Sequence, residues 1–169
     1  MTPTRPDGLS VDLLREIVRQ AEAGYPEEVC GAVIGRRGEP GTYEVRPLPN
    51  IANRQGPRGP DGRVRDARTA YLVDPIAECR LLKELEDSGR EIVVFYHSHP
   101  DADAYFSPMD RELALLGGRE PWWPGVSYLV VSVRRGQAKG AAFFTWDPDR
   151  REFMEQPVPA PAPEGIGPD

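Results

Sequence analysis

Both histidines of this 169-residue chain lie one residue apart, in the sequence His-Ser-His-Pro over residues 97–100. The apolar, β-branched run before them, residues 92–96, predicts a buried strand. Because side chains along a strand alternate between its two faces, His97 and His99 can point in the same direction. Two converging imidazoles with a carboxylate nearby suit a divalent metal such as zinc, which in catalytic sites keeps one position open for water.

Asp110 is the carboxylate that we favour as the third ligand. It follows Ser107 and Pro108, a pair typical of a helix start, with serine at the N-cap and proline at the first helical position. Capping alone is an alternative explanation, because Ser107 and Asp110 have the spacing of a capping-box-like pair. Their position after the two histidines favours ligation, since a helix N-terminus also favours a negative charge beside the metal.

The pattern His-x-His-Pro over residues 97–100, followed by Ser-x-x-Asp over residues 107–110, resembles the metal motif of the JAMM/MPN+ metallopeptidase family. Members of this family complete the site with an upstream glutamate, placed two residues before a Cys-Gly step. Residues 25–31 resemble that segment, and the spacing assigns the role to Glu28. The order and spacing of the other expected elements extend the resemblance to about residue 146.

The resemblance implies a catalytic zinc ion held by His97, His99 and Asp110. Zinc lowers the pKa of a bound water to about 7, and a general base must then carry a proton to the leaving amine. We assign that role to Glu28, although without the metal motif this acid and its neighbour would be read as two solvated carboxylates. Ser107, which matches the motif serine of the family, would donate a hydrogen bond to the oxyanion of the reaction.

The function that the resemblance implies is that of a zinc-dependent peptidase or isopeptidase. This chain is most similar to the prokaryotic members, which process small ubiquitin-like sulfur-carrier proteins next to their C-terminal Gly-Gly. Two alternatives stay open: a catalytically inactive JAMM-like scaffold, and a general zinc peptidase. A zinc deaminase would need His-x-Glu and Pro-Cys-x-x-Cys steps, and the sequence contains neither.

Other reactive side chains have simpler explanations. Asp101 and Asp103 are alternative ligands, but neither fits the spacing of the family, so we expect solvated loop acids. Cys30 lies in an apolar run and is expected to be a buried core residue rather than a thiol near the metal. Together with Cys79 it forms neither a C-x-x-C pair nor a disulfide framework, as expected in a reducing cytoplasm.

Composition limits the partners. Apolar residues make up 39% and charged residues 28%, as in ordinary soluble proteins, and the net charge is −6. Nucleic-acid binding needs a clustered basic face, whereas the arginines between residues 54 and 68 are interrupted by Gly, Pro and Asp and predict a solvated loop. No apolar run approaches the ~20 residues of a membrane span, and no signal sequence is evident. We therefore expect a cytoplasmic protein without nucleic-acid or membrane partners.

The remaining pattern predicts one α/β domain over residues 1–156. The expected helices cover residues 11–23, 75–87 and 107–116, and the expected strands cover residues 29–34, 42–48, 69–73, 92–96, 128–133, 138–146 and 150–156. The family resemblance implies a curved mixed β-sheet flanked by helices, the JAMM/MPN fold, which is similar to the deaminase fold. Residues 157–169 are Pro-rich and predict a disordered tail.

The sequence leads to three further expectations, for a polar loop, a tryptophan pair and the buried side of the second helix. The polar loop over residues 50–67 is either a mobile insertion or a substrate flap near the metal. The Trp122-Trp123 pair is expected to be a packing plug rather than a binding surface. In the second helix the apolar stripe predicted to be buried consists of Ile76, Leu81, Leu82 and Leu85.

Overall fold

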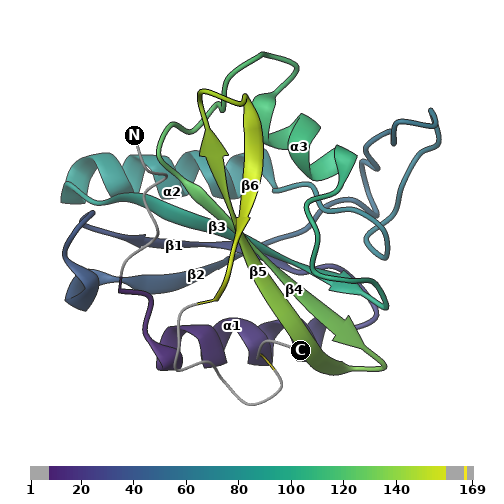
Figure 1. The fold of residues 1–169 in the computed structure, drawn as a ribbon, viewed down its shortest axis with the longest axis horizontal. Coiled ribbons are helices and arrows are strands. Elements are labelled where there is room, and N and C mark those ends of the chain that lie inside the picture. Colours follow the sequence, from purple (N-terminus) through teal and green to yellow (C-terminus); the bar gives the residue numbers. More distant parts are fainter. Residues whose placement is uncertain (1–7, 159–165, 167–169) are drawn as a thin grey trace.

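A strongly twisted sheet of six strands, in the order β2-β1-β3-β4-β5-β6, forms the centre of the computed structural model (Figure 1). The structure describes residues 8–158 and residue 166. The elements in chain order are α1 (Val11–Gly24), β1 (Cys30–Gly35), the 3₁₀ turn η1 (Pro40–Thr42), β2 (Glu44–Leu48), α2 (Pro75–Ser88), β3 (Glu91–Pro100), α3 (Pro108–Leu115), β4 (Ser127–Arg134), β5 (Gln137–Asp147) and β6 (Glu152–Gln156). Strands β3 and β4 pair in parallel and the other neighbours pair antiparallel, so the predicted mixed sheet flanked by helices is confirmed.

Helix α1 lies on one face of the sheet, and α2 and α3 lie on the other (Figure 1). Ser10 caps α1, because its hydroxyl accepts a hydrogen bond from the Leu13 amide. From Val94 onward the side chains of β3 alternate between the two layers: Val94 and Tyr96 join the core under α1, whereas Phe95 contacts the core under α2. Ile92 also joins the core under α2, because a register shift opposite Val33 and Ile34 interrupts the alternation. The face that carries α2 and α3 is also the one on which the histidines lie.

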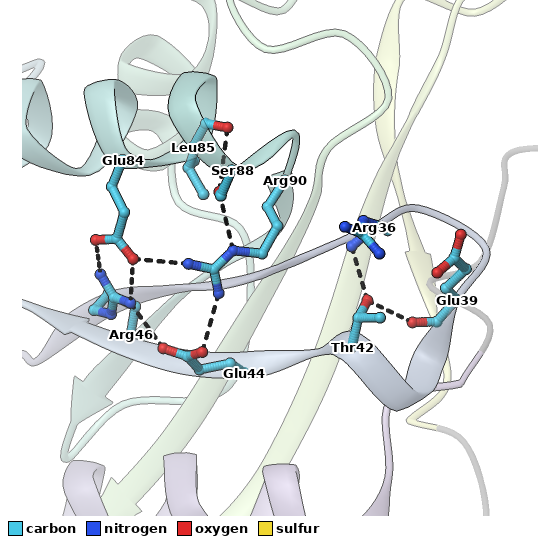
Figure 2. Close-up of polar contacts among 9 residues, drawn as sticks. All are labelled: Arg36, Glu39, Thr42, Glu44, Arg46, Glu84, Leu85, Ser88 and Arg90. Carbon is cyan, nitrogen blue, oxygen red and sulfur yellow. Dashed lines mark hydrogen bonds and ion pairs between the residues drawn. The ribbon is translucent and has the colours of Figure 1, made fainter.

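Charged side chains tie α2 to the edge strand β2 (Figure 2). The Arg46 guanidinium bonds Glu84 on α2 at 2.7 Å and Glu44 on its own strand at 2.7 Å. Arg90, just after the helix, pairs with the same two acids at 2.8 and 3.1 Å. In the connection between β1 and β2, the Thr42 hydroxyl accepts from the Arg36 amide at 2.8 Å and donates to the Glu39 carbonyl at 2.7 Å.

Two predictions at the level of elements are wrong. Residues 69–73 form no strand and make only one isolated bridge, between Val73 and Asn50. The Asn50 side chain replaces a strand partner, because its amide accepts from the Leu72 N–H at 3.0 Å and donates to the Ala70 carbonyl at 3.1 Å. In α2, Ile76 is 62% exposed, because it follows the Asp74 cap at the very start of the helix, whereas Leu81 and Leu85 are buried as predicted.

The segment over residues 50–67 packs against the domain. Ile51, Ala52 and Ala67 are buried, and the Ala67 carbonyl accepts a hydrogen bond from the Glu28 amide at 2.6 Å. Most of the predicted Pro-rich tail, residues 159–165 and 167–169, lies outside the described residues, but Ile166 is buried in the core under α1. Every helix in the described part of the chain is too short or too polar to cross a bilayer.

Candidate metal centre

Three buried side chains from β3 and α3 bring their ligand atoms to one point. His97 Nε2 lies 3.2 Å from His99 Nε2. The Asp110 carboxylate lies 3.1 Å from the first imidazole through Oδ1 and 3.3 Å from the second through Oδ2. The structure thus places the two histidines on one face of the strand and brings together the three residues predicted to hold a metal.

The start of α3 fixes the carboxylate. The Ser107 hydroxyl accepts from the Asp110 amide at 3.1 Å, and Asp110 Oδ2 accepts from the Ser107 amide at 2.8 Å, which is a complete capping box. Capping and convergence with the histidines therefore occur in the same side chain. Pro108 at the first helical position adds a fixed φ at the point where the helix begins.

Two contacts that no local sequence pattern predicts orient the imidazoles. His99 Nδ1 lies 2.9 Å from the Asp103 carbonyl. A carbonyl only accepts, so Nδ1 carries the hydrogen and the neutral ring presents a lone pair at Nε2. Tyr71 stacks on His97 with ring centroids 4.5 Å apart, which holds that ring in place. Both contacts form only when the chain folds, so no local motif predicts them.

The donor set fits zinc. Nitrogen and oxygen ligands at about 2.0–2.1 Å in a tetrahedral site are separated by about 3.3–3.4 Å, close to the 3.2 Å between the two imidazole nitrogens. Asp110 places one oxygen 3.1 Å from His97 and the other 3.3 Å from His99, and one ligand atom from each residue lies within 4.8 Å of the other two. Burial opposes protonation of His99, but the Asp110 carboxylate outweighs it and raises the pKa of this ring. In its neutral form His99 presents its lone pair to a carboxylate and a second imidazole, an arrangement of acceptors that a cation satisfies in place of the proton. Burial lowers the pKa of His97, which keeps its ring neutral and its nitrogens available for coordination.

The charge state of Asp110 also suits coordination. Burial by itself opposes ionisation of this carboxyl, but the adjacent imidazoles of His97 and His99 outweigh it and hold its pKa well below the usual range. The ionised form is the one that binds a cation. The lowered pKa therefore favours the form of Asp110 that can coordinate.

Glu28 lies in the same cleft as His99, Ser107 and Asp110, a cavity of about 170 Å³. Its side chain is 7% exposed, and Oε2 has no hydrogen-bond partner among the described residues. Burial raises the pKa of this carboxyl to about 8. A buried carboxyl with a free oxygen and a pKa near neutrality is equipped to accept and release protons.

The neighbouring acids and thiol lie apart from this group. Asp101 accepts from the Tyr25 hydroxyl and the Arg135 amide, and Asp103 pairs with Arg134 through its side chain. Cys30 is buried under α2, where its thiol donates to the Leu48 carbonyl, and burial raises its pKa to about 12. These contacts agree with solvated loop acids and a core thiol.

One tryptophan of the pair packs against the core and the other is exposed. Trp123 packs edge-on against Phe95, with ring centroids 5.9 Å apart, and contacts the core under α2. Trp122 is 63% exposed, and its backbone N–H donates to the Ala114 carbonyl. Only the second tryptophan of the pair is therefore a plug.

Comparisons with known proteins agree with this geometry. A family model described as prokaryotic homologs of the JAB domain matches residues 10–147. The chain is 33% identical over 122 residues to the desampylase of Haloferax volcanii, covering 72% of this chain and 74% of that protein. It is 29% identical over 126 residues to the CysO-cysteine peptidase of Mycobacterium tuberculosis, covering 75% and 73%. A solved structure from Salinibacter ruber aligns with a TM-score of 0.56 at 29% identity, covering 91% of this chain and 93% of that one.

Proposed function

The chain belongs to the family of prokaryotic homologs of the JAB domain, and from this membership we propose that it is a zinc-dependent peptidase acting on a small ubiquitin-like carrier protein. The family match confirms the resemblance inferred from the motif. The relatives named desampylase and CysO-cysteine peptidase favour a carrier with a bond next to its C-terminus as the substrate. Both cysteines are free thiols, which suits the reducing cytoplasm in which we place this activity.

One observation carries the proposal. Three residues bring ligand atoms within 4.8 Å of one another, and two of them, His99 and Asp110, line the same cleft as Glu28, a buried carboxyl that is free to move a proton. A scaffold protein has no need of this combination. Burying Glu28 without a partner for Oε2 costs folding free energy, and a catalytic role explains why that cost is tolerated.

His97, His99 and Asp110 would hold the ion. When bound there, zinc supplies a Lewis acid that polarises a carbonyl and acidifies water. Glu28 takes the proton of the attacking water and delivers it to the leaving amine, a task suited to a carboxyl whose pKa burial raises to about 8. The Ser107 hydroxyl accepts the capping bond from Asp110 and keeps its own hydrogen to donate to the developing oxyanion.

The size of the cleft favours a thin substrate. A space of about 170 Å³ at the ligand atoms admits an extended backbone with little side-chain volume. A Gly-Gly tail has no Cβ and allows the scissile carbonyl to approach closely. Main-chain pairing with a sheet edge would bind such a tail without demands on its side chains. Cleavage is therefore proposed directly after the second glycine.

The test uses a folded carrier bearing a short extension after Gly-Gly, incubated with enzyme and zinc and followed by mass spectrometry. Loss of the extension alone is expected, together with full inhibition by a chelator. Replacing the second glycine by valine should abolish cleavage, because its Cβ obstructs the approach to the cleft. A cut that survives the chelator would refute the zinc mechanism. Equal cutting of unfolded peptides without Gly-Gly would leave a general peptidase.

A further inference from the structure

Arg68 lines the same cleft as Glu28, His99 and Asp110. Of the described residues that border this cavity, it is the only arginine or lysine. The other ionisable groups there are the carboxyls of Glu28 and Asp110, the imidazole of His99 and the phenols of Tyr71 and Tyr105. The proposed chemistry of these groups requires no arginine, so this cation needs a separate explanation.

Four nearby arginines bind partners within the domain, whereas the Arg68 side chain binds none among the described residues. Arg54 pairs with Asp74, and both Arg63 and Arg65 pair with Asp61. Arg58 donates to the Gly62 carbonyl at 2.9 Å. Within residues 8–158 and 166, the guanidinium of Arg68 forms no ion pair or hydrogen bond, and only its backbone amide is bonded, to Asp66.

The backbone that carries Arg68 is nevertheless fixed. The preceding residue, Ala67, is buried, and both of its backbone groups form hydrogen bonds. Its amide donates to the Asn53 side chain at 2.9 Å, and its carbonyl accepts from the Glu28 amide at 2.6 Å. Two residues later, the carbonyl of buried Ala70 accepts from the Asn50 side chain. The anchored backbone places Arg68 at the cleft that Glu28 also lines, and its exposed guanidinium is available to an anionic ligand there.

We propose that Arg68 binds the α-carboxylate of the residue released from the carrier, an assignment that rests on the proposed peptidase function. The leaving amine must lie beside Glu28 to receive its proton. In a released amino acid the carboxyl carbon is only two bonds from that amine. The planar guanidinium of arginine matches a carboxylate with two parallel N–H···O bonds. The cleft therefore presents a proton carrier for the amine and a cation for the carboxylate of the same leaving group.

This subsite separates two classes of substrate. A carrier with a single residue after Gly-Gly places a free carboxylate next to the scissile amide. An isopeptide bond to a lysine side chain leaves an ε-amine that has no carboxylate nearby. Arg68 therefore directs the enzyme towards linear carriers ending in one extra amino acid, of the kind that the name CysO-cysteine peptidase describes for its relative.

The first arm of the test measures kcat/KM on three substrates. They are a carrier ending in Gly-Gly-Ala, the same carrier with a C-terminal carboxamide, and the carrier joined through Gly-Gly to the lysine of a capped peptide. The wild-type enzyme should prefer the free carboxylate over the carboxamide by about 10–100-fold, the range expected for hydrogen bonds to charged groups. In Arg68→Ala this ratio should fall to about 1. Arg63→Ala, on the same loop but outside the cleft, should retain the wild-type ratio.

The second arm measures binding without turnover. In a Glu28→Gln background, fluorescence anisotropy should show tighter binding of the carboxylate tail than of the carboxamide, and a further Arg68→Ala change should remove the difference. Equal affinities in the first background, or a carboxylate preference that survives Arg68→Ala, would overturn the assignment. A wild-type enzyme that cuts none of the three substrates would refute the proposed function, and the binding arm would still decide the role of Arg68.

Discussion

At the ligand atoms, geometry leads to a direct prediction of zinc content. Because His97, His99 and Asp110 bring their ligand atoms within 4.8 Å of one another, the purified protein should contain about one zinc per chain. His97→Ala and Asp110→Ala should each lower occupancy strongly, as measured by elemental analysis. Asp103→Ala is the matched control, because it removes a nearby carboxylate but keeps the backbone carbonyl that bonds His99. Wild-type zinc content in both ligand variants would contradict the ligand set.

The two adjacent glutamates give a second prediction, which separates the base from the ligands. Glu28→Gln preserves size and should retain zinc while lowering turnover by about 10²–10⁴-fold, because proton transfer is lost. Glu27→Gln should be almost silent, because Glu27 is exposed and its side chain only accepts from Asn53 at 3.1 Å. Steady-state kinetics on an extended carrier, with zinc content measured in parallel, check both. Equal losses in the two variants would mean that the assigned base is wrong.

Residue types and spacing were sufficient to predict that His97, His99 and Asp110 converge, because these residues lie in two short motifs on adjacent elements. The contacts that orient the two imidazoles could not be predicted from the sequence. Tyr71 reaches His97 from a segment that was predicted to be a strand, and Asp103 contributes a backbone carbonyl, which every residue possesses. Arg68 belongs to a run of arginines that predicted only a solvated loop. Contacts between distant segments leave no local periodicity from which to infer them.

Among the elements, the start of α3 has two roles that a matched pair of caps can separate. Ser107 and Ser10 each accept a hydrogen bond from the third residue of the helix they cap, at 3.1 and 3.2 Å. Replacing either by alanine should lower the free energy of unfolding by about 1 kcal/mol, as measured by urea titration. Only Ser107→Ala should also lower turnover, by about 10²–10³-fold, because it removes the proposed oxyanion donor. Equal turnover in the two variants would exclude that role.

The ion pairs between β2 and α2 predict how stability depends on pH. Hydrogen bonds from Arg46 lower the folded-state pKa values of Glu44 and Glu84 below the ordinary value of 4.5. A lowered pKa means that the stabilisation is present above pH 4.5 and is lost as the pH falls through the lower, folded-state value. Glu84→Gln should therefore lower the urea midpoint at pH 7, and the difference from wild type should shrink in acid.

The control for this prediction is Glu86→Gln on the same helix, because Glu86 is exposed and forms no ion pair with the described residues. Its urea midpoint should match that of the wild type at both pH values. A Glu84→Gln deficit that stays constant between pH 7 and acid would contradict the electrostatic explanation. Since the pairs are largely exposed, the effect should also weaken as salt is added.

Helices and strands with clear periodicity were predicted to within a few residues, and the errors have a common cause. The segment at residues 69–73 has the composition of a strand, but its hydrogen bonds go to the Asn50 side chain. Ile76 fits the apolar period of α2 but lies in the first turn, beyond the edge of the sheet core. Tertiary contacts override local pattern in both cases.

At the scale of the whole molecule, the order of strands explains why the site forms where it does. Strand β3 lies between β1, which follows Glu28, and β4, with which it pairs in parallel. The connection from β3 to β4 must cross over the sheet, and α3 lies within it, so the crossover carries Asp110 back to the histidines. The chain order of motifs is visible in the sequence, whereas this closure depends on pairings between distant strands.

The core between the sheet and α1, on the face opposite the histidines, leads to the last prediction, which concerns stability rather than catalysis. Ile166 is 3% exposed and packs in the core cluster that contains Leu14 and Ile17 of α1, on the side of the sheet away from the ligand atoms. Ile166→Ala should lower the free energy of unfolding by about 2–5 kcal/mol, because it removes buried methyl groups and leaves a cavity. Ile76→Ala, the same change at a side chain that is 62% exposed, should alter stability by no more than about 0.5 kcal/mol. Urea titration of the two variants tests this prediction, and equal midpoints would mean that Ile166 does not stabilise the core. Zinc content should stay at the wild-type level in both variants, because neither residue belongs to the group formed by His97, His99 and Asp110.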